Sequence, residues 1–163
     1  QRLHPYLTLM VGRLHDHLQR VMAKESVTVE PGFLHWAGVA VFKRAHRLFR
    51  EKGYRSTLLS AAYRHHLHWS QLAGPGVILT MPYAWWNQFN ASSVEVKARL
   101  EEPVAPAVLG ALLALFPDFR RAYEPDGLRP EEFVHYGATL HTLNQFLGGY
   151  HDLLAFVRER MLR

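Results

Sequence analysis

The sequence predicts an α/β protein with about three parallel strands, intervening helices and an all-helical C-terminal extension. Apolar runs at residues 7–11, 56–62 and 77–81 have the length of strands. The second run is apolar without alternation, as in a strand that is covered on both faces. Stretches with helical spacing separate the runs, and strands that alternate with helices are typical of a parallel sheet.

The elements follow one another in the order strand, helix, strand. The strand at 7–11 is expected to end at Gly12, and apolar residues then recur at helical spacing to Ala23. A second helix is predicted over residues 32–52, because Pro31 suits a first helical turn and Gly53 suits a helix end. The strand at 56–62, a short helix at 65–72 and the strand at 77–81 complete this part.

Helical patterns alone follow the prolines at positions 103 and 106. One helix is predicted over residues 107–116, where Pro117 stops it, and a last helix runs from Pro130 or Gly137 to Met161. We therefore expect two parts, a strand-containing part over residues 1–103 and a helical extension over residues 104–163 that packs on it.

Composition narrows the class of protein. The 163 residues are 48% hydrophobic, which indicates a folded chain with a sizeable core. The net charge of +5 is spread among acidic residues and forms no basic block, so we expect no binding to nucleic acid. The absence of cysteine and of any long apolar stretch predicts a cytoplasmic protein that does not bind a membrane.

Two strand-like runs are each followed by an arginine, Arg13 and Arg64. The carboxyl ends of neighbouring parallel strands form the ligand-binding edge of α/β proteins. A guanidinium can engage two oxygens of a phosphate at once. The pair therefore predicts a phosphate-binding site.

These segments resemble the transaldolases. Thr8-Leu-Met-Val-Gly-Arg13 and Ala61-Ala-Tyr-Arg-His65 are similar to motifs on the sixth and seventh barrel strands of that family. Gly76-Val-Ile-Leu-Thr-Met-Pro82 looks like the eighth strand, and Phe119-Arg-Arg-Ala-Tyr-Glu-Pro-Asp-Gly-Leu128 like the tail before the final helix. The resemblance implies the C-terminal part of a (β/α)8 TIM barrel.

The resemblance also implies an activity. Transaldolases transfer a dihydroxyacetone unit between sugar phosphates through a Schiff base on a strand-borne lysine, without a cofactor. The resemblance implies that Arg13, Arg64 and Thr8 bind the substrate phosphate. His65 and Trp85 are further candidates for substrate contact. Ala62 stands where the family has serine and His65 where asparagine is usual, which puts the identity of the substrate in question.

The Schiff-base lysine of the family lies on an earlier strand than any in this chain. We expect its four lysines, at positions 24, 43, 52 and 97, to be solvated, and assign none as the nucleophile. The chain is therefore expected to be a fragment, a processed product or one piece of a split protein. Its partner would be the N-terminal half of the barrel or further copies of itself. The alternative is a non-catalytic or self-assembling half-barrel that binds a phosphorylated ligand.

Two aromatic patterns leave alternatives open. His65 and His68 are three residues apart and could share a metal, but a third ligand is not evident, so structural histidines and no metal are expected. The pair Trp85 and Trp86 could stack on a sugar ring, although packing after a strand is the favoured interpretation.

Overall fold

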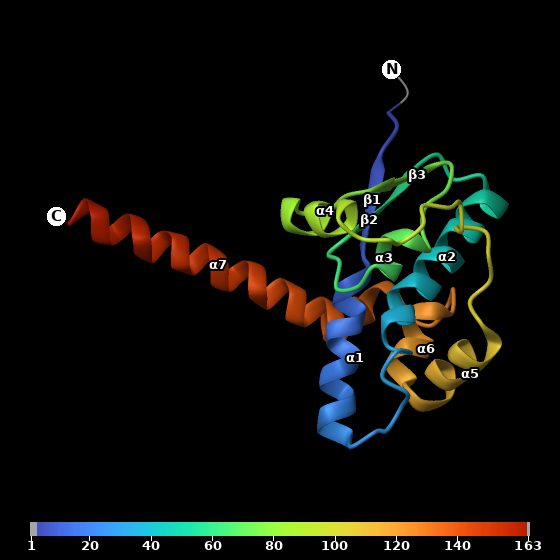
Figure 1. Cartoon of the computed structure of the whole chain (residues 1–163). Coiled ribbons are helices and arrows are strands. Elements are labelled where there is room, and N and C mark those ends of the chain that lie inside the picture. Colours follow the sequence, from blue (N-terminus) through green and yellow to red (C-terminus); the bar gives the residue numbers. More distant parts are fainter. Residues whose placement is uncertain (1–2, 163) are drawn as a thin grey trace. The chain divides into compact units, whose positions relative to one another are not determined.

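The structure, a computed structural model, describes residues 3–162 (Figure 1). Its strands are β1 (Tyr6–Met10), β2 (Thr57–Ala61) and β3 (Val77–Leu79). The helices are α1 (Val11–Glu25), α2 (His35–Lys52), α3 (Leu67–Ser70), α4 (Tyr83–Asn90), α5 (Pro106–Leu115), α6 (Pro117–Tyr123), the 3-10 helix η1 (Pro130–His135) and α7 (Gly137–Met161).

The three strands form one parallel sheet in the order β1-β2-β3, as predicted. Leu9 of β1 lies beside Ser60 of β2, which in turn lies beside Leu79 of β3. Because side chains alternate along a strand, these three share one face of the sheet. Leu9 and Leu79 pack into an apolar cluster with α2, so this face is the one that the helix covers.

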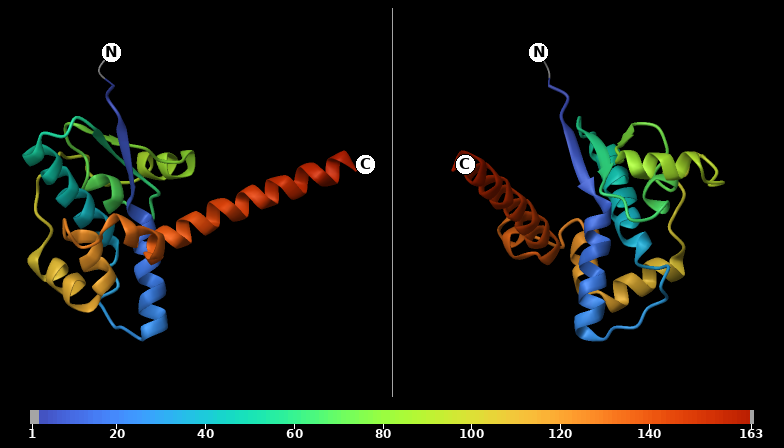
Figure 2. Two further views of the ribbon diagram at one scale, coloured as in Figure 1. Left: turned by 180° about the vertical axis from the view of Figure 1, so that it is seen from behind. Right: turned by 60° about the vertical axis from the view of Figure 1, so that its left-hand side comes forward.

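The first strand ends earlier than expected, and its last residue is followed at once by a helix (Figure 2). Gly12 therefore does not end a strand but lies in the first turn of α1. A Cβ atom at Gly12 would overlap the backbone carbonyl of Ala62, which follows β2. Glycine is needed here because α1 begins in direct contact with the chain after the neighbouring strand.

The core consists of two clusters that share α2. One joins α2 to α1, α5 and α6, and its fully buried members include Leu18, Leu112 and Phe119. The other joins α2 to the sheet through Phe42 and Leu58. Apolar residues on both sides of α2 explain the broad stripe that the sequence shows between residues 33 and 49.

Two helices were not expected. The aromatic run after Pro82 forms α4, and Pro117 begins α6 as well as ending α5. Proline suits the first turn of a helix because its ring holds φ near the helical value and the missing N–H would have no helical acceptor there. Pro117 therefore separates two helices that share Phe116 as a boundary residue.

The chain divides into two compact units between Gly127 and Leu128. This division lies beyond residue 103, because α5 and α6 pack against α1 and α2 within the first unit. The second unit contains η1 and α7, so both suggested starts, Pro130 and Gly137, correspond to helix starts. Within residues 3–162, no helix has the length and hydropathy needed to cross a lipid bilayer.

Lys43 is buried, which corrects the expectation that all four lysines are solvated. Its side chain on α2 is 7% exposed, and Nζ donates hydrogen bonds of 2.8 Å to the carbonyls of Arg99 and Glu102. A longer contact of 3.4 Å reaches Oε1 of Gln71. Burial lowers the pKa of Lys43 to about 8. The ammonium thus fastens the segment at 99–102 to α2.

We predict that Lys43→Met lowers the free energy of unfolding by about 2–3 kcal/mol, because two carbonyls lose a charged donor while the apolar stem is kept. Urea unfolding followed by circular dichroism measures the change. Lys52→Met is the control, since Lys52 is exposed at the end of α2 and should change stability by less than about 0.5 kcal/mol. Equal effects of the two substitutions would contradict the structural role of Lys43.

Candidate functional site

The two arginines follow neighbouring strands of the sheet, β1 and β2. Arg64 follows β2, as predicted, whereas Arg13 is not at the end of a strand but in the first turn of α1. Ala62, between β2 and Arg64, has a φ of 62°, which places a residue with a side chain in the left-handed region. This conformation costs on the order of 1 kcal/mol, and the contact with Gly12 accompanies it.

Asp16 joins the two arginines, and sequence reasoning missed this residue. Arg64 donates from Nε to Oδ1 at 2.9 Å and from Nη2 to Oδ2 at 2.7 Å, a bidentate pair. Nη1 of Arg13 lies 4.0 Å from Oδ2 of the same carboxylate. The spacing of Arg13 and Asp16, three residues apart on one helix, was the available signal.

The cluster of Arg13, Asp16 and Arg64 can still bind an anion. Two guanidinium groups and one carboxylate leave one net positive charge (+2 − 1). Arg64 also donates from Nη1 to the Tyr63 carbonyl at 2.9 Å, so its three described contacts use three of five N–H groups. The side chains of Arg64 and Asp16 are 35% and 19% exposed. Because both are partly buried, solvent only partly screens the attraction between the remaining N–H groups of Arg64 and an anion.

A pocket of about 290 Å³ brings together three of the sequence-predicted residues, Arg64, His65 and Trp85. Its other walls come from α4 and the segment that follows it. The wall residues besides these three are His66, Gln88, Phe89, Ser92 and Val94. The pocket combines a guanidinium, imidazoles and aromatic faces, which suits a polar ligand with a phosphate and a carbon skeleton.

Thr8 and Arg13 do not line this pocket. Thr8 lies on β1 beside Leu59, and its side chain is exposed. Since the adjacent Leu9 packs toward α2, Thr8 points to the opposite face of the sheet. Thr8 could therefore contact a ligand only if that ligand lies on the face of the sheet opposite α2.

Trp85 has a packing role and also borders the pocket. Its ring stacks on Phe89 with centroids 5.4 Å apart, and Phe89 in turn contacts Trp69 at 4.9 Å. The neighbouring Trp86 is exposed and stacks on Tyr83 instead. The favoured packing interpretation therefore describes Trp85, whose half-buried ring still presents surface to the pocket.

Five histidines gather beside the arginine cluster, contributed by α1, α2, α3 and the turn after β2. Ring centroids lie 4.6 Å apart in the stacked pair His15–His35 and 4.1 Å apart in the stacked pair His35–His65. They lie 4.3 Å apart in the tilted pair His65–His66, and His68 completes the group. Stacked rings direct their nitrogens in parallel planes, and among residues 3–162 no group of three or more ligands is arranged to hold a metal.

His68 holds the backbone beside Arg64. It is fully buried, its Nδ1 accepts the backbone N–H of Arg64 at 3.1 Å, and Nε2 donates to the His35 carbonyl at 3.1 Å. These two bonds require a neutral ring with its proton on Nε2. Burial lowers the pKa of His68 to about 3 and that of His65 to about 4, so both rings are neutral at physiological pH.

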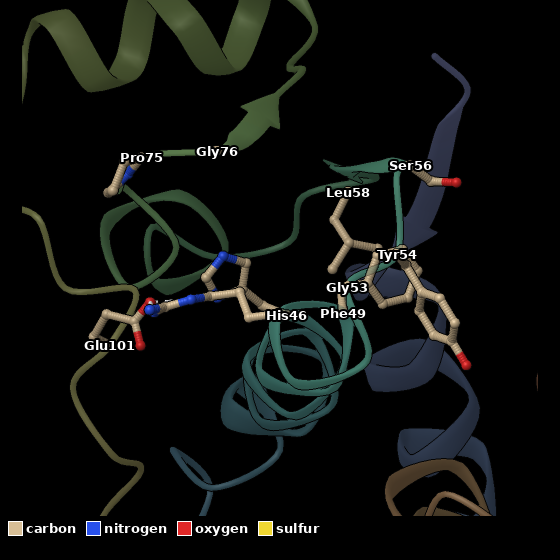
Figure 3. A pocket seen from close by; sticks show the side chains of 10 residues that line it. His46, Phe49, Gly53, Tyr54, Ser56, Leu58, Pro75, Gly76 and Glu101 are labelled. Atoms are coloured by element: carbon tan, nitrogen blue, oxygen red, sulfur yellow. Dashed lines mark hydrogen bonds and ion pairs between the residues drawn. The ribbon is translucent and has the colours of Figure 1, made fainter. Parts of the chain in front are cut away.

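A larger hollow of about 570 Å³ lies at the other end of the sheet, where β2 and β3 begin (Figure 3). His46, Arg50 and Glu101 line it, and Arg50 forms an ion pair of 2.7 Å with Glu101. In parallel α/β folds ligands bind at the carboxyl ends of the strands. The smaller pocket beside Arg64 is therefore the candidate site.

We predict that Asp16→Asn lowers the free energy of unfolding by about 1–2 kcal/mol, because a partly buried guanidinium loses its charged acceptor. Chemical unfolding measures the loss. Glu95→Gln removes an exposed carboxylate that pairs with Lys97 at 2.8 Å and with Arg99 at 3.6 Å, and should cost less than about 0.5 kcal/mol. If Asp16→Asn is no more harmful than this control, the bidentate pair does not order the site.

Acid should destabilise the protein through His68. Its folded pKa of about 3 is below the value of 6.5 in the unfolded chain, so the unfolded state binds the proton first as the pH falls. Stability is therefore complete above pH 6.5 and declines toward pH 3, by up to about 1.4 kcal/mol per pH unit for this group.

Thermal unfolding between pH 7 and pH 4 measures this slope. His68→Gln, which can keep one donor and one acceptor, should show a shallower decline than the parent protein. His135→Gln, at an exposed position on η1, should keep the parent slope. Parallel curves for the parent and for His68→Gln would show that His68 does not set the acid sensitivity.

Comparison with known proteins gives one family. Residues 4–115 match the family model described as transaldolase/fructose-6-phosphate aldolase. No curated protein and no solved structure matches the chain. The match covers the sheet, both arginines and Asp16, and it confirms the resemblance inferred from the motifs. The chain belongs to the transaldolase/fructose-6-phosphate aldolase family.

Proposed function

We propose that this chain supplies the phosphate-binding part of a transaldolase-like enzyme that transfers a dihydroxyacetone unit between sugar phosphates. One observation carries the proposal: Arg13 and Arg64 meet on the carboxylate of Asp16, just beyond the carboxyl ends of adjacent parallel strands. A fixed pair of guanidinium groups at this edge suits a dianionic phosphate, and family membership supports the same ligand.

The carboxylate of Asp16 orients Arg64 but accepts from only some of its N–H groups. It accepts from Nε and Nη2, so hydrogens on the two terminal nitrogens, Nη1 and Nη2, can still bind a ligand. A phosphate bound there would place its sugar toward the adjoining pocket, against His65 and Trp85. The neutral imidazole of His65 can donate or accept a hydrogen bond to a hydroxyl, and the indole face suits the C–H face of a sugar.

The sheet suits a place in a (β/α)8 barrel. Thr8, Leu59 and Ile78 lie side by side on the face opposite α2, and no described helix of the first unit packs on them in the apolar clusters. In a closed barrel this face would be the interior, where the Thr8 hydroxyl could reach a ligand. The remaining strands would come from an N-terminal half or from further copies.

The Schiff-base lysine would come from outside these residues. A nucleophilic lysine must lose its proton and attack the ketone carbon of the sugar, after which the iminium accepts the electron pair of the broken C–C bond. None of the four lysines of the chain lies on a described strand. Lys43 has a lowered pKa but donates to two carbonyls and one amide oxygen, and so holds a structural position.

This absence of a strand lysine also favours a second candidate function. The chain would bind a phosphorylated ligand, or assemble, without turning the ligand over. The two candidates share the phosphate site and differ in whether an iminium forms when the rest of a barrel is present.

Titration of the chain with fructose 6-phosphate, followed by calorimetry, tests the phosphate site. Arg64→Met should weaken binding at least tenfold, because a bidentate charged contact is lost. Arg20→Met is the control for net charge, since Arg20 is exposed on α1, and should change affinity by less than about twofold. Equal loss in both variants, or no binding by the parent, contradicts the proposal.

Borohydride reduction in the presence of fructose 6-phosphate separates the two functions. Intact mass spectrometry should show no three-carbon adduct on this chain, and an adduct on a partner polypeptide if one copurifies. An adduct on this chain would refute the claim that its lysines are structural or solvated. A copurifying partner without an adduct would favour binding or assembly over catalysis.

A further inference from the structure

A small cavity beside α2 lies apart from the candidate site and contains none of its residues. Its volume is about 160 Å³, and its wall comes from α2, residues 100–104, α5 and α6, all within the first unit. Sites for larger organic ligands measure about 300–1,000 Å³, so this cavity suits a small ion. Its charged wall residues are Lys43, Arg44, Arg47, Glu101 and Glu102.

Arg44 and Arg47 bring two guanidinium groups to this cavity without protein acceptors. They are three residues apart on α2 and are therefore neighbours on its surface. Among residues 3–162, neither side chain forms a hydrogen bond or an ion pair, and Nε of Arg44 is also buried. The guanidinium of Arg44 thus loses water around Nε without gaining an acceptor, which is unfavourable. An anion on the terminal nitrogens would compensate this charge.

Lys43 adds a buried charge to the same wall. Its side chain is 7% exposed, and its Nζ donates to two backbone carbonyls, which carry no net charge. Burial lowers the pKa of Lys43 to about 8, so the ammonium is still protonated at neutral pH. Solvent screens a buried charge less than an exposed one. The cavity therefore keeps a positive field from Lys43.

Only one of the two carboxylates beside the cavity has a cationic partner. Glu101 accepts from Arg50 at 2.7 Å, and its Oε1 lies 3.5 Å from Nδ1 of His46. The carboxylate of Glu102 is exposed and forms no ion pair in the described part of the chain, whereas its backbone carbonyl accepts from Lys43. Once Glu101 is matched by Arg50, three cations of the wall face a single carboxylate. Positive charge is therefore in excess.

We propose that this cavity binds a small dianion of the phosphate type, as a second anion site separate from Arg64. Two neighbouring guanidinium groups can engage several oxygens of one phosphate, and the excess charge matches a dianion. The hydroxyl of Tyr123 on α6 is a further donor at the wall. The ligand is inorganic phosphate or the terminal phosphate of a small ester, because both present the same oxygens. Once bound, it joins α2 to α6.

Calorimetric titration of the full chain with inorganic phosphate, at constant ionic strength, tests this site. Arg64→Met is the background, because phosphate binding at Arg64 is then removed and only the cavity remains. This variant should still bind one phosphate per chain. Adding Arg44→Met or Arg47→Met should weaken binding about tenfold or more. Adding Arg20→Met instead removes the same charge from the exposed surface of α1 and should change affinity by less than about twofold.

The outcomes separate this proposal from the proposed function. No phosphate binding by Arg64→Met, or equal losses from Arg47→Met and Arg20→Met, would overturn the second site. One phosphate bound both by the parent and by Arg64→Met would support the second site and contradict the site at Arg64. Arg47 is exposed, so Arg47→Met should keep the near-ultraviolet circular dichroism of its background, which shows that the fold is intact.

Glycerol 3-phosphate, titrated into the same Arg64→Met background, distinguishes the two sources of phosphate. Tighter binding than that of inorganic phosphate would assign the cavity to a phosphate ester, and weaker binding would assign it to the free ion. Equal heats from sodium chloride at the same ionic strength would show general screening of charge and would contradict a phosphate site.

Chemical modification of arginine with phenylglyoxal locates the bound ion. Peptide mass spectrometry of the Arg64→Met protein should show that phosphate slows the modification of Arg47 about threefold or more, because the bound ion covers its terminal nitrogens. Modification of Arg20 should be unchanged. Equal protection of Arg47 and Arg20, or protection of neither, would refute binding in this cavity.

Discussion

The direct contact between the start of α1 and the chain after β2 is the constraint on which the site depends. Gly12 lies against the carbonyl of Ala62, and a side chain at Gly12 would separate the two segments. This contact brings the first turn of α1 beside Arg64, so that Asp16 can accept from Nε and Nη2 at once. Ala62 adopts a left-handed conformation in the same place. Local backbone strain is tolerated here because packing on both sides determines the path of the chain.

Arg64 is further held by groups that carry no charge. Its backbone N–H bonds to His68, and the ring of His68 bonds to the carbonyl of His35 at the start of α2. Arg64 is thus tied to α1 through its guanidinium, and its backbone is tied to α2 through the neutral ring of His68. Because burial lowers the pKa of His65 and of His68, these two imidazoles are uncharged at physiological pH and add nothing to the positive charge of the two guanidinium groups. In the proposed phosphate site, selectivity would then depend on the geometry of the two guanidinium groups and on their fixed charges.

The sequence predicted the sheet better than the site. Apolar runs set the three strands and their parallel order, and glycine at position 53 marked the end of α2 in a left-handed conformation. Those signals are local. The pairing of Asp16 with Arg64 spans 48 residues, and the stack of His15 on His35 joins two helices, so neither has a local signature. Burial of Lys43 was missed for the same reason, because its acceptors are carbonyls of a segment more than fifty residues away.

The edges of the described sheet and the backbone of α7 differ in what they require from a partner. β1 and β3 are the edges of the described sheet, and edge strands present unpaired N–H and C=O groups that only another strand can satisfy along their length. α7 satisfies its own backbone hydrogen bonds, so a helix of this kind cannot pair with an edge strand through its backbone. The proposed barrel would therefore need further strands at both edges of the sheet. The pairing of Asp16 with Arg64 needs no such partner, because both residues lie within the first unit.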